Sequence, residues 1–236
     1  MTTITRQAPV RPSPFAVPQR ASEKTPQDIS SDRFDFEFPS NPVHTDATNL
    51  YQLPQEEAPT LQRPVLLVHG FNGNPNNWEN MHTWLTRGGD NKDGGIVKGS
   101  GGTVKPDAKV FVMEFTRPFN PVHMNAKELR QAIDKITAAT GASEVDVVAH
   151  SMGGLDTRLY LDQGNEKVNN LVMIGTPNRG SVLADLEMTF RELGLPIKPP
   201  TDDPLVRQAL TDLGEVRGDN NPLLTGLNRS WDRQRE

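Results

Sequence analysis

Ser151 lies in a pattern that could make its hydroxyl a nucleophile. Residues 145–155 read Val-Asp-Val-Val-Ala-His-Ser-Met-Gly-Gly-Leu, so a short apolar strand runs into the serine and a helix-forming segment follows. Such a sharp strand-to-helix turn lifts a serine hydroxyl above the end of a parallel sheet. The turn brings backbone segments close together, and small residues two positions before and after the serine, Ala149 and Gly153, permit this. The alternative interpretation is a structural turn serine.

A second motif, His69-Gly70-Phe71, ends an apolar run and could stabilise an oxyanion. Acyl transfer needs backbone N–H groups directed at the oxygen on which negative charge develops. We expect the N–H groups of Met152, directly after the serine, and of Phe71 to form this oxyanion hole. Gly70 permits the backbone turn that presents the next N–H. The alternative is a strand-exit turn without a catalytic role.

No histidine follows Ser151, although a serine nucleophile needs a base. The chain has five histidines: His44, His69, His82, His123 and His150. The side chain of His150 is expected to project away from its neighbour Ser151, and His123 precedes a predicted helix at the rim of the site. The acids after the serine include Asp156, Asp162, Asp185, Asp202, Asp203, Asp212 and Asp219. None of these acids follows a clear strand.

The serine and the glycine turn require a framework of alternating strands and helices. Strands are predicted at 65–69, 109–115, 145–150 and 168–174, and helices at 76–87, 126–140 and 153–162. Strands that alternate with helices over short loops favour a parallel sheet covered on both faces. The predicted fold class is therefore α/β, with a mostly parallel sheet and helices on both faces.

Two further segments have uncertain roles. Residues 88–103 are rich in Gly and Asp but lack the features of a phosphate loop and the spacing of a calcium loop. We interpret them as a flexible insertion, with no metal site. Residues 182–193 place four apolar side chains on one helical face, namely Leu183, Leu186, Phe190 and Leu193. This helix either packs in the core or covers the site as an amphipathic element.

Composition excludes several classes of protein. The chain has 236 residues, a net charge of −5 and no long basic run, so a nucleic-acid partner is not favoured. It has no cysteine, which rules out disulfides, thiolate metal sites and a cysteine nucleophile. No stretch approaches the ~18 apolar residues of a membrane span, and the N-terminus lacks an apolar signal-peptide core. The cytoplasm is the default compartment, and secretion without an apolar signal is the alternative.

The proline content divides the chain. Residues 1–60 are rich in Pro, Ser, Thr and charge, and are predicted to form a disordered Pro-rich tail. Within this tail, residues 33–38 alternate with period two, which fits either an edge strand or an apolar patch. Residues 61–236 are predicted to form the folded domain.

The chain resembles α/β-hydrolases of the lipase and esterase kind, including bacterial triacylglycerol lipases and the inositol-deacylase-like group. The resemblance covers roughly residues 60–230 and depends on four stretches, at 64–71, 148–155, 171–181 and 221–228. It implies hydrolysis of carboxylic esters, often of lipids, without an organic cofactor. In this family the triad runs Ser, acid, His along the chain. The missing histidine therefore leads us to expect the N-terminal portion of the fold, C-terminally incomplete.

Two functions follow from this resemblance. The first is a serine hydrolase of carboxylic esters, acting through Ser151 with a base and acid from outside this sequence. The alternative is a catalytically impaired fragment that binds a partner or is complemented by one. A third interpretation keeps the fold and changes the substrate to an amide. Because the strand at 171–174 would then form a sheet edge, we also expect a complementing C-terminal segment or self-association there.

Overall fold

The computed structural model describes residues 58–102, 104–185, 203–215 and 221–230. The predicted tail, except residues 58–60, and residues 186–193 of the predicted amphipathic helix lie outside these ranges. The sheet consists of β1 (Val65–Val68), β2 (Asp93–Lys98), β3 (Val110–Glu114), β4 (Val145–His150) and β5 (Val168–Ile174).

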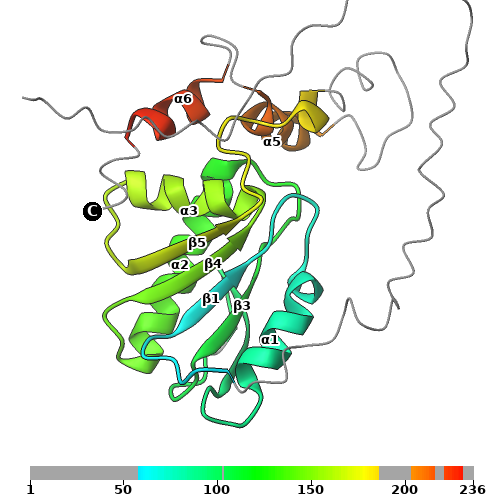
Figure 1. Ribbon diagram of the computed structural model, residues 1–236. Helices are drawn as coiled ribbons and strands as arrows, with labels where there is room; N and C mark the ends of the chain where they lie inside the picture. Colours follow the sequence, from blue (N-terminus) through cyan, green and yellow to red (C-terminus); the bar gives the residue numbers. More distant parts are fainter. Residues whose placement is uncertain (1–57, 103, 186–202, 216–220, 231–236) are drawn as a thin grey trace, which may run out of the picture. The chain divides into compact units, whose positions relative to one another are not determined.

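The sheet is parallel throughout the described residues, with the order β2-β3-β1-β4-β5 (Figure 1). All four residues of β1 are buried, as expected for an apolar strand at the centre of a sheet covered on both faces. The register pairs Val68 with Ala149 and His150 with Ile174, so β1, β4 and β5 end at one edge. The predicted fold class is confirmed.

Four helical elements form layers on the two faces of this sheet: η1 (Pro75–Trp78, a 3-10 turn), α1 (Glu79–Thr86), α2 (Val122–Thr140) and α3 (Met152–Asp162). Two further helices, α5 (Pro204–Leu213) and α6 (Pro222–Arg229), lie apart from these layers. Helices α2 and α3 pack on one face, and η1 with α1 packs on the other. The helices of these two layers bury apolar side chains against the sheet, and this burial holds the layers together.

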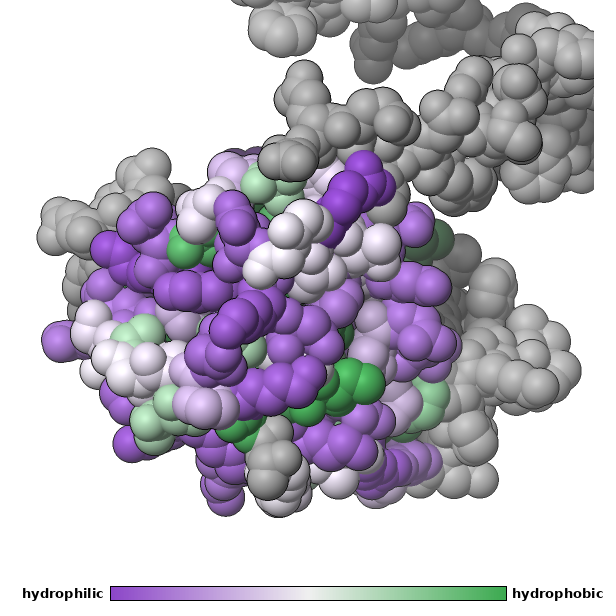
Figure 2. All heavy atoms as spheres, turned by 90° about the horizontal axis from the view of Figure 1, so that it is seen from below, coloured by the Kyte–Doolittle hydropathy of each residue, from purple (hydrophilic) through white to green (hydrophobic). Residues whose placement is uncertain are grey.

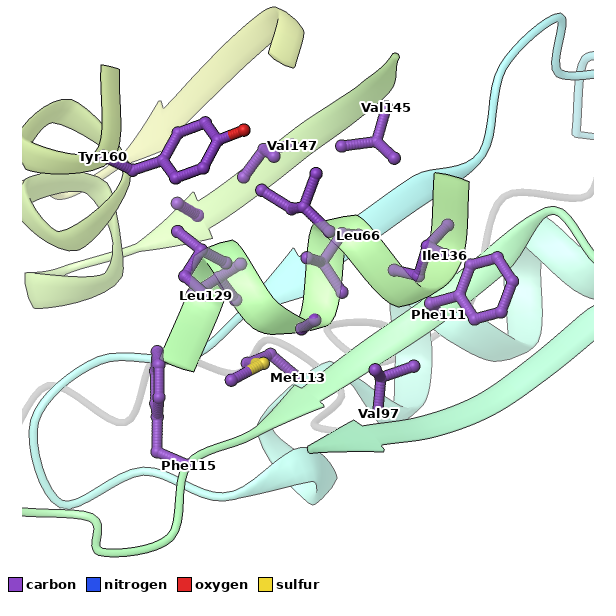
Figure 3. Packing of buried hydrophobic residues seen from close by; sticks show 14 of the residues in the cluster. Leu66, Val97, Phe111, Met113, Phe115, Leu129, Ile136, Val145, Val147 and Tyr160 are labelled. Carbon is purple, nitrogen blue, oxygen red and sulfur yellow. The ribbon is translucent and has the colours of Figure 1, made fainter. Parts of the chain in front are cut away.

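Strand β1 contributes side chains to the hydrophobic clusters on both faces of the sheet. Leu66 joins the cluster under α2 and α3, whereas Leu67 joins the cluster under α1. Figure 3 shows the first cluster, in which Leu129 of α2 and Tyr160 of α3 lie over the strand residues. Because neighbouring side chains of a strand point to opposite faces, one short apolar strand anchors the helices of both layers.

Three sequence expectations need correction. Residues 88–103 are not only a flexible insertion, because Asp93–Lys98 form β2 at the edge of the sheet. Helix α2 begins at Val122 rather than at residue 126, so His123 belongs to the helix. The helix predicted at 76–87 divides into η1 and α1.

Strand β2 was missed because Gly94 and Gly95 lower its apparent strand propensity. Gly94 packs so close to the Phe111 ring that a β-carbon at this position would lie 2.2 Å from the ring.

Helices α5 and α6 lie over the carboxyl ends of the strands. Their apolar residues Val206, Leu210 and Leu224 join Val122 of α2 and Met152 of α3 in a separate buried cluster. Both helices have side-chain caps, since Asp203 accepts a hydrogen bond from Leu205 N and Asn221 accepts one from Leu224 N. This cluster fixes the first turns of α2 and α3 at the same edge of the sheet as Ser151.

Strand β5 forms one edge of the sheet in the described residues, as the sequence predicts. Two of its apolar side chains are well exposed, Val172 at 53% and Ile174 at 41%. Val172 pairs with Val148, which packs against the cluster under α1, so both lie on the α1 side. By contrast, the face of the molecule seen from below is mostly hydrophilic, with only small separate apolar patches (Figure 2).

Candidate active site

Ser151 occupies the turn between β4 and α3 with an unusual backbone conformation. Its φ is 53° and its ψ is −126°, a combination that costs strain in a residue with a β-carbon. The turn is held from both sides, because Ser151 N donates to Ile174 O at 2.9 Å and Gly154 N donates to Ser151 O at 3.1 Å. The predicted sharp strand-to-helix turn is therefore present, and Ser151 is half-buried at the edge where the strands end.

Three glycines allow the backbone to close around this turn. A β-carbon added at Gly70 would lie 2.7 Å from Ser151 Cβ and 2.9 Å from His150 O. A β-carbon at Gly153 would lie 2.7 Å from His69 O, and one at Gly154 would lie 2.1 Å from Thr176 Oγ1. Since real β-carbons do not approach this closely, the loop after β1, the start of α3 and the loop after β5 fit together only with glycine at these positions.

The loop after β1 is rigidly held. His69 is buried, and its ring packs edge-on against the Phe115 ring, with 5.1 Å between the ring centroids. Its Nδ1 donates a hydrogen bond to Gly70 O at 3.0 Å. Burial lowers the pKa of His69, which favours the neutral ring. Farther along, Asn72 N donates to Pro118 O at 2.7 Å, with Asn72 at a φ of 55°. His69 is therefore a buried residue that supports the loop, and no hydrogen bond joins it to Ser151 in the described part of the chain.

The backbone N–H groups of Phe71 and Met152 flank the close contact between Gly70 and Ser151. A β-carbon at Gly70, the neighbour of Phe71, would lie 3.1 Å from Met152 N. Neither N–H group donates a hydrogen bond to any other residue in the described part of the chain. The Phe71 ring packs against the Phe119 ring, with 5.6 Å between the ring centroids, and this contact fixes the position of Phe71. The two amides are thus close to each other, held in place and without an internal acceptor.

None of the other described histidines forms a hydrogen bond with the side chain of Ser151. His82 in α1 pairs with Asp93 at 2.9 Å, and His123 is exposed on α2, where it lines a cavity with Glu128. His150 is exposed and lines a different cavity with Trp78 and Ile174. His44 lies outside the described residues. Within the described ranges no hydrogen bond reaches the Ser151 hydroxyl.

Two of the acids after Ser151, Asp156 and Asp212, are buried close to the site. Asp156, one turn after Ser151 in α3, is fully buried and accepts a hydrogen bond from Asn125 Nδ2 at 3.1 Å. Burial raises the pKa of Asp156 well above its usual value, and it also raises the pKa of Asp212 in α5. Asp212 accepts from Val122 N at 3.0 Å and so attaches α5 to the start of α2. Their positions suit a structural role beneath the site rather than contact with a substrate.

The described ranges contain no group of three or more His, Asp or Glu side chains arranged to hold a metal ion. No helix in the same ranges is both long enough and apolar enough to cross a bilayer.

Comparison with known proteins places this geometry in context. Residues 63–202 match the family model described as alpha/beta hydrolase fold. The chain is 30% identical over 124 residues to a triacylglycerol lipase of Pseudarthrobacter phenanthrenivorans, covering 52% of this chain and 35% of the lipase. A triacylglycerol lipase of Burkholderia plantarii is also 30% identical over 124 residues, with 52% and 31% covered. The chain thus spans about a third of the length of these curated relatives.

A solved structure shares the arrangement of strands and helices. The phospholipase PlaB from Legionella pneumophila, in complex with thio-NAD, superposes with a TM-score of 0.52 and 21% identity, covering 72% of this chain and 34% of that chain. At this identity the likeness concerns the fold alone.

Proposed function

The chain belongs to the alpha/beta hydrolase fold family, and we propose that its Ser151 is the nucleophile of a serine hydrolase that cleaves carboxylic esters. The observation that carries the proposal is the backbone of Ser151, with φ 53° and ψ −126° at the turn into α3. Glycine would occupy this conformation without strain, so a serine kept there indicates that the hydroxyl itself is needed. The similarity to triacylglycerol lipases supports an ester, and within that class a lipid ester, as the substrate.

In the proposed mechanism, Ser151 Oγ attacks the acyl carbon and transfers its proton to a base. The carbonyl oxygen becomes an oxyanion, which accepts hydrogen bonds from the N–H groups of Phe71 and Met152. These donors are preorganised, because the Gly70 contact and the Phe71–Phe119 packing hold them before substrate arrives. The N-terminus of α3, which begins at Met152, adds its favourable dipole. The alcohol leaves with the proton, and water then hydrolyses the acyl-serine by the reverse sequence.

We propose that the base and its acid come from outside this sequence, supplied by a complementing segment. Loss of a triad member lowers turnover by up to about six orders of magnitude, and about 10³–10⁴-fold acceleration over water remains from the oxyanion hole and binding. The 236-residue chain alone should then hydrolyse esters very slowly. Addition of the missing groups should restore turnover without any change at Ser151.

One observation favours a second candidate, a hydrolase-like protein that binds a partner or lipid without turnover. None of the described histidines reaches the Ser151 hydroxyl, so the chain holds the turn and the amides without a base beside them. Measurable turnover of a p-nitrophenyl ester by the chain, abolished by Ser151→Ala, would exclude this candidate.

Active-site labelling distinguishes the two candidates. A fluorophosphonate probe should react with the chain at Ser151 and should not react with Ser151→Ala. The matched control is Ser143→Ala, which removes an exposed serine from the loop before β4 and should label like the parent chain. Labelling that survives Ser151→Ala would contradict the assignment of the nucleophile. A chain that never labels, even when a segment that supplies the base and the acid is added, would support the non-catalytic candidate.

A further inference from the structure

A polar cavity of about 390 Å³ lies beside α3, and its described lining consists of Arg158, Asn178, Arg179 and Asn228. Arg158 comes from α3, Asn178 and Arg179 come from the loop after β5, and Asn228 comes from α6. Two of the four side chains are cationic and none is acidic. The volume is within the range of small-molecule sites.

Arg158 forms a fixed floor for this cavity. The residue is 1% exposed, and its guanidinium donates to Asn178 Oδ1 at 2.6 Å, Asn228 Oδ1 at 3.1 Å and Leu227 O at 2.7 Å. These bonds join the cavity's three elements. Burial lowers the pKa of the guanidinium, while the charge of Asp162 opposes that change. The guanidinium carries a positive charge at the wall of the cavity, and this charge attracts an anion placed there.

The bonds from Arg158 also decide which way the two amide groups face. A guanidinium can only donate, so both asparagine oxygens must point toward it and both NH₂ groups must point away. Asn228 Nδ2 donates to Asn178 O at 2.8 Å. Asn178 Nδ2 has no acceptor among the described residues and is available to a ligand. The exposed Arg179 guanidinium likewise forms no hydrogen bond or ion pair in the described part of the chain.

The cavity belongs to the same structural unit as Ser151. The loop that carries Asn178 and Arg179 begins directly after β5, and its Thr176 packs against Gly154 in the first turn of α3. Arg158 follows Ser151 by two helical turns, which corresponds to a rise of about 10 Å along the axis. A group bound in the cavity could therefore be part of a molecule that also reaches the serine.

We propose that this cavity binds a phosphate group, received by Arg179, Asn178 Nδ2 and the charge of Arg158. A single guanidinium fork satisfies the two oxygens of a planar carboxylate, whereas donors from two arginines and an amide match the larger number of oxygens on a phosphate. The same chemistry is offered by free phosphate and by the phosphodiester of a lipid headgroup. The second source rests on the proposed function, since it makes the phosphate part of an ester substrate cleaved at Ser151.

Isothermal titration on the full chain tests the site independently of catalysis. The titrants are inorganic phosphate, glycerophosphocholine as a soluble headgroup diester, and acetate. The variant Arg179→Gln removes the exposed cation, and the control Arg130→Gln removes an exposed arginine of α2 that does not line the cavity. Ser151→Ala is titrated as well, because binding should not depend on the nucleophile.

We expect both phosphate compounds to bind more tightly than acetate. Arg179→Gln should weaken this binding by at least about tenfold, as loss of a charge-assisted contact does, while Arg130→Gln and Ser151→Ala leave it unchanged. Binding of the diester supports a lipid headgroup, and binding of inorganic phosphate alone supports free phosphate. Equal binding by the Arg179→Gln and Arg130→Gln variants, or acetate binding as tight as phosphate binding, would overturn the proposal. Neither result depends on whether Ser151 labels.

Discussion

Gly70 and Ser151 are packed so closely that a β-carbon on the glycine would lie 2.7 Å from the β-carbon of the serine. This contact joins the loop after β1 to the turn after β4, and it brings Phe71 beside Met152. The two amides proposed as the oxyanion hole are therefore positioned by the absence of a side chain at Gly70. The candidate site depends on this fit as much as on its serine.

Gly70→Ala should damage the site directly. The new methyl group would overlap Ser151 Cβ and His150 O, so the loop must shift, at a cost of about 1–3 kcal/mol. We expect a lower melting temperature and a fluorophosphonate labelling rate reduced at least tenfold. Gly226→Ala is the matched control, because a β-carbon in that α6 position meets nothing within 4 Å. Labelling at the parent rate in Gly70→Ala would show that the loop does not position the oxyanion donors.

Ser151→Gly should stabilise the fold relative to Ser151→Ala. Both variants lose the hydroxyl, but only glycine adopts φ 53° and ψ −126° without strain, which is worth about 1 kcal/mol or more. Scanning calorimetry should give the glycine variant the higher melting temperature, and neither variant should label. If the alanine variant melted at the same temperature or higher, the turn would not be storing strain for function.

Asp156→Asn should change the pH dependence of stability. Burial raises the pKa of Asp156, Asn125 opposes the shift, and the charges of Asp212 and Glu128 add to it. From about pH 4 up to the raised pKa, the folded chain retains a proton that the unfolded chain releases, so stability falls as pH rises. Asn cannot ionise, and the variant should therefore show a smaller fall between pH 5 and pH 8.

Melting temperatures measured across that pH range check this expectation. Some slope should remain in Asp156→Asn, because burial also raises the pKa of Asp212. The exposed Asp90 provides the control, since Asp90→Asn should leave the profile of the parent chain unchanged. Identical profiles for all three proteins would argue against a buried, protonated Asp156.

Val172→Lys should reduce association of the chain through β5. Val172 is 53% exposed on an edge strand, where lysine discourages pairing with another strand. We expect lower apparent mass in light scattering, with stability changed by no more than about 0.5 kcal/mol. Ile96→Lys, at 52% exposure on the opposite edge strand β2, is the matched control and should have a smaller effect. A parent chain that is already monomeric with a cooperative melt would contradict this expectation.

Local patterns in the sequence were sufficient for most of the sheet. Continuous apolar runs identified β1 and β3, because strands buried in a parallel sheet are apolar on both faces. Strand β2 was missed, since two adjacent glycines resemble a loop until the Phe111 ring is seen against Gly94. The start of α2 was placed too late because Pro121 and His123 do not continue the apolar spacing, and Asp212, distant in sequence, holds Val122 in place.

By itself, the sequence determined the fold class, the place of Ser151 between a strand and a helix, and the absence of a histidine after it, because each depends on neighbouring residues or on composition. Only the tertiary structure decided that Gly70 touches Ser151, that Asp156 is buried, and that Arg158 meets Asn178 and Asn228. These contacts join separate segments of the chain. They arise when layers pack at interior density, where shape and burial, rather than local residue preference, select the neighbours.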